Sequence, residues 1–262
     1  LVAAGRMHMG LVLLSGTHIR LSPGVNAGTV ALQTLAARST YEQDDWQEML
    51  YGANGLLALY ARMFGDPWQA AARFEPLLPA GLAQPAMELP FAAGERWSLT
   101  AGPHTAWTTG TPRGAVDFAP VTNEPLCVVS TAWATASTAG LVVRAERGAV
   151  VIDLDGDGLE QTGWVLVYMH IAEQDRVAVG TWVEVDVPLG HPSCEGGAAT
   201  GTHVHLARKY NGEWVAANGP LSLVLSGWTA HAGEKRYEGT LEKDGQVVTA
   251  HPDGGYGSTI VR

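Results

Sequence analysis

The sequence predicts an α+β protein, in which a small N-terminal helical region is followed by a mainly antiparallel β-sheet domain. Helix-capping signatures and helical spacing of apolar residues lie before about residue 75, whereas short β-branched runs between Gly and Asn turns follow residue 92. The composition agrees, because 32 glycines, nine tryptophans and a charged fraction of only 16% favour a β-rich secreted protein over a helical cytosolic one.

Residues 1–75 form the expected helical region. Ser39 and Glu42 fit a capping box, with Ser39 as the N-cap of a helix. Asp66, which precedes a proline, is typical of the N-cap of a shorter helix over 67–74. Because the chain starts at a leucine rather than a methionine, we expect the true N-terminus and any signal peptide to be missing.

A proline-rich segment separates this region from the rest of the chain. Residues 76–92 contain four prolines, which is too many for a helix or a central strand. We expect the segment to be a linker that packs as extended chain. The change of pattern after it marks the start of a β-rich domain over residues 93–262.

Short runs rich in β-branched and aromatic residues predict the strands of this domain. They are Leu126–Ser130, Gly140–Arg144, Ala149–Leu154, Gly163–Ile171, Trp182–Val187, Thr202–Arg208 and Glu213–Ala216. An Asp-Gly turn at residues 244–245 predicts a C-terminal hairpin between Tyr237–Leu241 and Gln246–Ala250.

The charge pattern excludes some classes of partner. The net charge of −10, without any run of Lys or Arg, gives nucleic acid no surface to bind. No apolar stretch approaches the length of a bilayer-spanning helix, so we expect no stable membrane insertion, and we expect a monomer. The two cysteines, Cys127 and Cys194, form either a disulfide or two separate buried thiols, and the sequence leaves both open.

The run Gly201–Ala207, read Gly-Thr-His-Val-His-Leu-Ala, carries two histidines one residue apart. Because side chains alternate along a strand, His203 and His205 should share a face, about 7 Å apart along the backbone. Two imidazoles above one spot suit a zinc ion, although a structural pair of histidines explains the pattern as well.

Other segments of the second domain add candidate polar groups. His104 follows Gly102-Pro103 in a turn-like loop. Asp117 lies in an apolar, strand-like run, where a carboxylate is costly unless it is hydrogen-bonded or bound to a metal. Tyr168 and His170 alternate, so they should share one face of a strand. A catalytic zinc takes three protein ligands, and the surplus groups can move protons and hold an oxyanion.

The order His, Asp, Tyr-x-His and His-x-His over about residues 91–228 resembles the M23 family of zinc endopeptidases, the lysostaphin/LytM type. Most members separate the His and Asp by three residues, whereas twelve residues lie between His104 and Asp117 in this chain. The spacing is similar to that of the LasA (staphylolysin) branch, where a long insertion separates the two ligands. The glycine-rich run 196–201 also resembles the family's approach to its His-x-His strand.

The resemblance implies that His104, Asp117 and His205 bind zinc. It also implies that His203 and His170 face the water that zinc activates and the scissile carbonyl. One of these two histidines can accept a proton from the water while the other donates to the oxyanion, and spacing does not assign which does which. Tyr168 either adds a hydrogen bond at the site or is a core tyrosine with its hydroxyl satisfied elsewhere.

The acidic run at residues 153–158 resembles the first half of an EF-hand calcium loop. Trp164 stands where the bidentate glutamate of such a loop is expected. We therefore interpret the run as an acidic, Gly-rich turn that joins two strands, with Ca²⁺ at Asp153, Asp155 and Asp157 as the alternative.

These features predict a secreted or cell-envelope zinc endopeptidase. The resemblance implies that it cleaves peptides of bacterial peptidoglycan, in cross-bridges or stem peptides and including Gly-Gly bonds. The alternative is a catalytically silent, zinc-binding protein that binds or scaffolds at the cell wall. Degenerate members usually lose a ligand or a proton-handling histidine, and this chain keeps all of them, which favours the enzyme.

Overall fold

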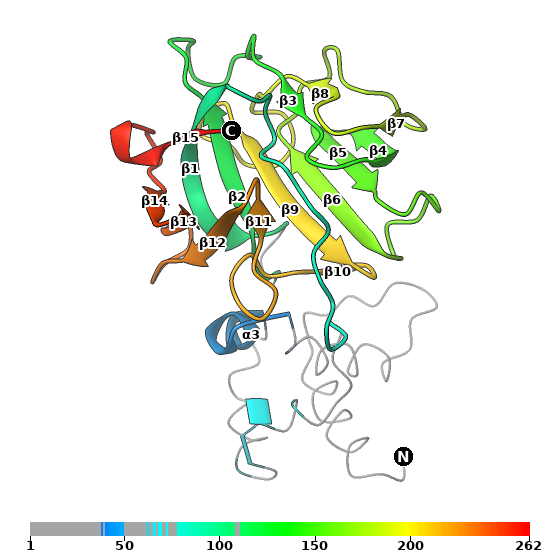
Figure 1. The fold of residues 1–262 in the computed structure, drawn as a ribbon, viewed down its shortest axis with the longest axis vertical. Coiled ribbons are helices and arrows are strands. Elements are labelled where there is room, and N and C mark those ends of the chain that lie inside the picture. The colour runs from blue at the N-terminus through cyan, green and yellow to red at the C-terminus, as the bar shows by residue number, and fades with distance from the viewer. Residues whose placement is uncertain are drawn as a thin grey trace. The chain divides into compact units, whose positions relative to one another are not determined.

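The computed structural model describes residues 38, 40–49, 62, 65, 66, 68, 69, 72, 78–107 and 111–262. The chain divides into two compact units, residues 1–82 and residues 83–262. The second unit is a mainly antiparallel β-sheet domain (Figure 1).

In the first unit, the structure describes the short helix α3 (Gln43–Met49). Glu42 is its N-cap, since the Glu42 carbonyl accepts the backbone N–H of Trp46 at 2.9 Å. Ser39, the predicted N-cap, lies outside the described residues, but residues 40–42 are not helical, so the helix begins later than predicted. Tyr41 and Trp46 are both buried, and they occupy the two positions of a hydrophobic staple around this helix start.

The predicted cap at Asp66 is confirmed, because Asp66 Oδ1 accepts the backbone N–H of Trp68 at 2.9 Å. The Trp68 ring meets the ring of Trp46 edge-on, with centroids 5.7 Å apart. The rest of the helical region expected over residues 1–75 lies largely outside the described residues. Among the residues that the structure describes, no helix is long and apolar enough to cross a membrane.

The second unit contains three antiparallel sheets. Their strands are β1 (Arg96–Thr105), β2 (Arg113–Pro120), β3 (Ala134–Thr135), β4 (Gly140–Glu146), β5 (Ala149–Asp153), β6 (Trp164–Met169), β7 (Trp182–Val183), β8 (Pro188–Gly190), β9 (Val204–Tyr210), β10 (Glu213–Trp214), β11 (Val224–Leu225), β12 (Trp228–Ala232), β13 (Gly239–Lys243), β14 (Gln246–Thr249) and β15 (Thr259–Val261), with the 3-10 helix η2 (Tyr256–Ser258) before β15.

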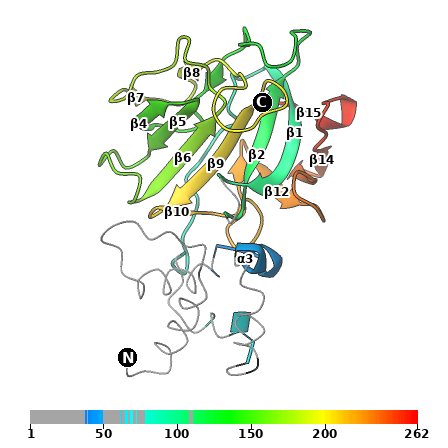
Figure 2. The same cartoon turned by 180° about the vertical axis from the view of Figure 1, so that it is seen from behind.

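The largest sheet has nine strands, in the order β15-β1-β2-β9-β6-β5-β4-β7, with β10 paired to β9. Both views show β1, β2, β9 and β6 side by side in its middle (Figures 1 and 2). The order β11-β12-β13-β14 forms a second sheet, and β3 pairs with β8. The nine-stranded sheet therefore places β1, β2 and β9 next to one another, although β9 lies far from β1 and β2 in the sequence.

One face of the largest sheet packs on the main hydrophobic core. On β2, Val116 and Phe118 enter this core, so Asp117 between them points to the opposite face. Leu89 and Phe91, which precede β1, are fully buried in the same core. Phe91 also stacks on Trp97 of β1, with ring centroids 4.8 Å apart. The end of the proline-rich segment thus contributes to the core of the β-rich unit.

Most predicted strands are present, including the hairpin that now appears as β13 and β14. The strand predicted over Leu126–Ser130 is wrong, because Cys127 has a φ of 60° and Leu126 is exposed. That segment is instead held by a disulfide between Cys127 and Cys194, which closes a sequence separation of 67 residues. A disulfide of this kind indicates an oxidising, extracytoplasmic environment.

Strand β1 was not among the predicted runs, and its Gly-Pro pair predicted a loop around His104. The prediction is wrong, because His104 lies within β1. The ladder between β1 and β2 shifts register between Ala101 and His104, and Pro103 lies in this irregular part. Such a bulge is where a strand tolerates a residue without a backbone N–H.

Candidate metal centre

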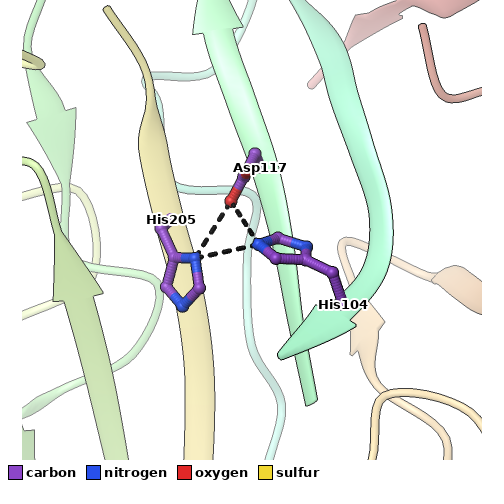
Figure 3. A group of neighbouring side chains, drawn as sticks. All are labelled: His104, Asp117 and His205. Carbon is purple, nitrogen blue, oxygen red and sulfur yellow. Dashed lines mark hydrogen bonds and ion pairs between the residues drawn. The ribbon is translucent and has the colours of Figure 1, made fainter. Parts of the chain in front are cut away.

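Side chains from three neighbouring strands meet on the sheet face opposite the core (Figure 3). His104 comes from β1, Asp117 from β2 and His205 from β9, and all three are buried. Asp117 Oδ1 lies 3.3 Å from His104 Nε2 and 3.2 Å from His205 Nδ1. The two nitrogens are 3.1 Å apart, although 101 positions separate the residues in the sequence.

Strand register accounts for this convergence. Asp117 stands directly opposite His205 in the ladder between β2 and β9. Ala101 pairs with Asp117, so regular antiparallel pairing would place Pro103 opposite Ala115, but the bulge places His104 there instead. The extra residue therefore turns the imidazole, rather than the proline, towards the face that carries Asp117.

Backbone carbonyls fix the tautomers of the two histidines. His104 Nδ1–H donates to the Gly102 carbonyl at 2.9 Å, and His205 Nε2–H donates to the Ala106 carbonyl at 2.9 Å. When the rings are neutral, His104 Nε2 and His205 Nδ1 therefore carry lone pairs. These lone pairs converge with Asp117 Oδ1, a buried oxygen without a hydrogen-bond partner. A cation is what satisfies three such atoms together.

The spacing of the three atoms fits zinc. Ligands about 2.0 Å from a tetrahedral ion lie about 3.3 Å from one another, and the three distances here run from 3.1 to 3.3 Å. Two imidazole nitrogens with one carboxylate oxygen are also a donor set that zinc prefers. The triad thus forms a buried metal site consistent with zinc.

The electrostatics favour an ionised Asp117. Burial raises the pKa of its carboxyl, but His104, His205 and His203 outweigh this effect, and the pKa lies well below the usual value. Burial lowers the pKa of His104, but Asp117 and the hydrogen bond to the Gly102 carbonyl together raise it by more, so the net shift is upward. The site therefore presents a negative charge to whatever cation it holds.

His203 and His170 lie beside the triad. His203 Nε2 is 3.6 Å from Asp117 Oδ2, so His203 and His205 do share a face. The rings of His170 and His203 have centroids 4.3 Å apart. Each ring again donates its Nδ1–H to a carbonyl, His203 to Gly201 at 2.8 Å and His170 to Glu195 at 3.0 Å. When either ring is neutral, its lone pair is therefore on Nε2.

The segment 193–195 connects these two histidines. Ser193 donates its backbone N–H and its hydroxyl to the His170 carbonyl, at 2.7 and 3.0 Å. Ser193 also forms an isolated β-bridge with His203. Cys194, in the middle of the segment, carries the disulfide to Cys127. The disulfide therefore anchors the stretch of backbone that positions both rings.

Tyr168 does not join the site. It is fully buried in the main core, and its hydroxyl accepts the backbone N–H of Ser137 at 2.8 Å. Burial raises its pKa to about 12. The expected shared face with His170 is wrong, because β6 ends at Met169 and His170 has a φ of 64°, which breaks the alternation of side chains.

Tyr237, which follows β12, was not predicted to lie at the site. Its ring stacks on the His104 ring, with centroids 4.6 Å apart, while 57% of the residue remains exposed. The Tyr237 carbonyl accepts the backbone N–H of Gly102, in the β1 bulge. This contact pairs residues far apart in the sequence, so no local pattern predicts it.

Comparisons with known proteins agree with the site. No family model matches the chain. The chain is 29% identical over 216 residues to Protease LasA of two Pseudomonas aeruginosa strains, UCBPP-PA14 and PAO1. Each match covers 75% of this chain and 48% of the relative, so the chain spans about half the length of the curated relatives it matches.

A solved structure described as a novel M23 metalloprotease, pseudoalterin, from the deep sea shares the fold. The TM-score is 0.51 at 22% identity, and the match covers 64% of this chain and 96% of that one. The chain therefore has the fold of this M23 metalloprotease and carries a buried metal site made of His104, Asp117 and His205. It is a distant homologue of Protease LasA.

Proposed function

We propose that this protein is a zinc-dependent endopeptidase that hydrolyses peptides of bacterial peptidoglycan. The proposed bonds lie in cross-bridges or stem peptides and include Gly-Gly bonds. The observation that supports catalysis is a buried three-donor site next to two histidines whose Nδ1–H groups are held by backbone carbonyls. The substrate class follows from the resemblance to the M23 family.

In this proposal, His104, Asp117 and His205 hold the metal through Nε2, Oδ1 and Nδ1. The carbonyls of Gly102 and Ala106 keep the two rings in the tautomers that coordination needs. When bound, zinc supplies a Lewis acid that polarises the scissile carbonyl and acidifies a water molecule.

His170 and His203 are the proposed proton-handling residues. Burial, followed by the neighbouring His203 and His205, lowers the pKa of His170 to about 4, so at pH 7 its Nε2 can accept a proton. One of the two rings takes a proton from the attacking water, and the other donates a hydrogen bond to the developing oxyanion. Their ring contact supports a role for both at one reacting carbonyl.

We also propose that the protein is secreted or attached to the cell envelope and acts as a monomer. The disulfide and the homology to Protease LasA support a place outside the cytoplasm. With a net charge of −10, the protein gains no electrostatic steering towards an anionic wall, so recognition depends on contacts within the site.

We propose that the helical region over residues 1–75 is not needed for the chemistry, which resides in the β-rich domain over residues 93–262. A chain that starts at Ala83, the first residue of the second unit, tests this. It should hydrolyse the same peptides as the full chain. A folded, zinc-loaded chain of this length without activity would assign the first region a catalytic role.

Mass spectrometry of fragments released from purified peptidoglycans of different bridge types tests the proposed function. Pentaglycine serves as a defined substrate, and the His203→Ala variant serves as the inactive control. We expect new amino and carboxyl termini at peptide bonds of at least one wall type. Bound zinc without any cleavage would instead favour a silent protein that binds or scaffolds at the wall.

A further inference from the structure

A second cluster of metal-binding groups lies in the turn that joins β5 to β6, two strands that lie side by side in the sheet (Figure 1). Asp153, Asp155 and Asp157 each offer a carboxylate oxygen, and these oxygens all lie within 4.8 Å of one another. That is the separation of two oxygens on opposite sides of a Ca²⁺ ion with bonds of about 2.4 Å. The three can therefore share one ion.

Asp153 has one carboxylate oxygen that lacks a partner. Its side chain is fully buried, and its Oδ2 accepts the backbone N–H of Gly158 at 2.8 Å, so the carboxylate points into the turn. Its Oδ1 has no hydrogen-bond partner. A buried carboxylate oxygen without a partner is costly, and a bound cation removes that cost.

The charge of the turn is also uncompensated. In the part of the chain that the structure describes, no Lys or Arg forms an ion pair with Asp153, Asp155 or Asp157, while Arg144 and Lys209 both pair with Glu160. Burial raises the pKa of Asp153, and Asp155 and Asp157 raise it further. No described Lys or Arg thus offsets the repulsion among the three carboxylates.

We propose that this turn is a calcium site, separate from the His104 centre, that stabilises the β5–β6 hairpin. Trp164 replaces the bidentate glutamate, so backbone carbonyls and water complete the shell. We therefore expect an affinity in the range of about 10⁻⁴ to 10⁻³ M, which is typical of extracellular modules. Because β6 leads directly to His170, a bound ion also steadies one support of the catalytic face.

Terbium luminescence of the zinc-loaded, full-length protein tests the site. Trp182 borders the turn, since a Cβ on Gly156 would lie 3.0 Å from its ring, so excitation of tryptophan should sensitise bound Tb³⁺. Calcium should displace the bound Tb³⁺ and reduce its emission. Magnesium should displace it poorly, because magnesium demands a smaller octahedral shell. The variant Asp155→Asn with Asp157→Asn should bind at least about tenfold more weakly, because the ligand charge falls. Asp244→Asn, in an exposed turn, is the matched control.

Thermal unfolding gives a second readout. At 10 mM, a concentration well above the expected dissociation constant, Ca²⁺ should raise Tm by about 3–10 °C in the wild type and the control. The double variant should show no such shift and should retain its zinc. The proposal is overturned if the wild type gives neither sensitised terbium emission nor a calcium shift, or if the double variant responds like the control.

Discussion

Asp117 and His205 stand opposite each other on antiparallel strands, with Oδ1 of the first 3.2 Å from Nδ1 of the second. Their neighbours Val116 and Leu206 are paired in the same ladder and face the core. A slip of one residue would exchange the faces, burying the carboxylate in the core. The same alternation thus sets both the core and the metal site.

A substitution at Gly102 tests how strand β1 positions the His104 ring. A Cβ at this residue would lie 2.6 Å from the Glu238 carbonyl oxygen, while the Gly102 carbonyl holds the His104 ring. Gly102→Ala should therefore displace His104 and weaken zinc binding by at least about tenfold. Competition with a fluorescent chelator measures this, with Gly257→Ala as the control because its Cβ meets nothing within 4 Å. Equal affinities would show that β1 adapts without moving the ligand.

The disulfide should affect turnover as well as stability. Replacing Cys127 and Cys194 by serine removes a cross-link over 67 residues, which should lower the free energy of unfolding by about 4 kcal/mol. Because segment 193–195 holds His170 and His203, kcat should fall while zinc content stays at the wild-type level. Urea unfolding, metal analysis and peptidase assays report the three quantities. An unchanged kcat in the folded variant would limit the disulfide to a stabilising role.

His170 predicts a pH dependence of stability in the zinc-free protein. Its folded pKa of about 4 lies below the ordinary value of 6.5, so the unfolded chain takes up the proton first as pH falls. The stability linked to His170 is complete above about pH 6.5 and is lost as pH falls towards 4. From pH 7 to pH 5, the wild type should lose about 1–2 kcal/mol more than His170→Gln in urea unfolding. Parallel losses in the two proteins would mean that His170 is not buried as a neutral ring.

Arg208 on β9 is a fully buried cation without a carboxylate partner among the described residues. Burial lowers its pKa to about 9, and it donates hydrogen bonds to the Ala216 and Leu221 carbonyls and to the Gln84 side chain. Arg208→Met should remove the guanidinium donors from the Ala216 and Leu221 carbonyls and lower the free energy of unfolding by about 2–5 kcal/mol. Arg96→Ala, at an exposed position, should change stability little in the same urea titration. A stable Arg208→Met protein would show that water replaces the guanidinium.

Local sequence patterns predicted much of the β-rich unit. The β-branched runs gave β4, β5, β6 and β9, and the Asp-Gly turn gave the C-terminal hairpin. Strand β1 escaped prediction because its Gly, Pro and Ser residues lack the usual strand signature, and it is defined by pairing with β2 and β15. The strand prediction for Leu126–Ser130 failed because a disulfide, rather than hydrogen bonds to a neighbouring strand, holds that segment.

Some features of the site follow from local sequence patterns, whereas others depend on contacts between distant segments. Alternation along β9 correctly put His203 and His205 on one face, because both reach Asp117. Alternation failed for Tyr168 and His170, because a left-handed backbone at His170 ends the strand pattern. No local pattern shows that a bulge turns His104 towards Asp117, or that Tyr237 stacks on His104. These features depend on contacts between segments far apart in the chain.

Zinc content and turnover, measured together for Asp117→Ala and His203→Ala, test the central claim most directly. Asp117 Oδ1 is one of the three converging donor atoms, whereas His203 approaches only the other carboxylate oxygen. We predict about one zinc per chain in the wild type and in His203→Ala, and almost none in Asp117→Ala, with peptidase activity lost in both variants. Retention of zinc by Asp117→Ala, together with its loss from His203→Ala, would contradict the assignment of ligands and proton-handling residues.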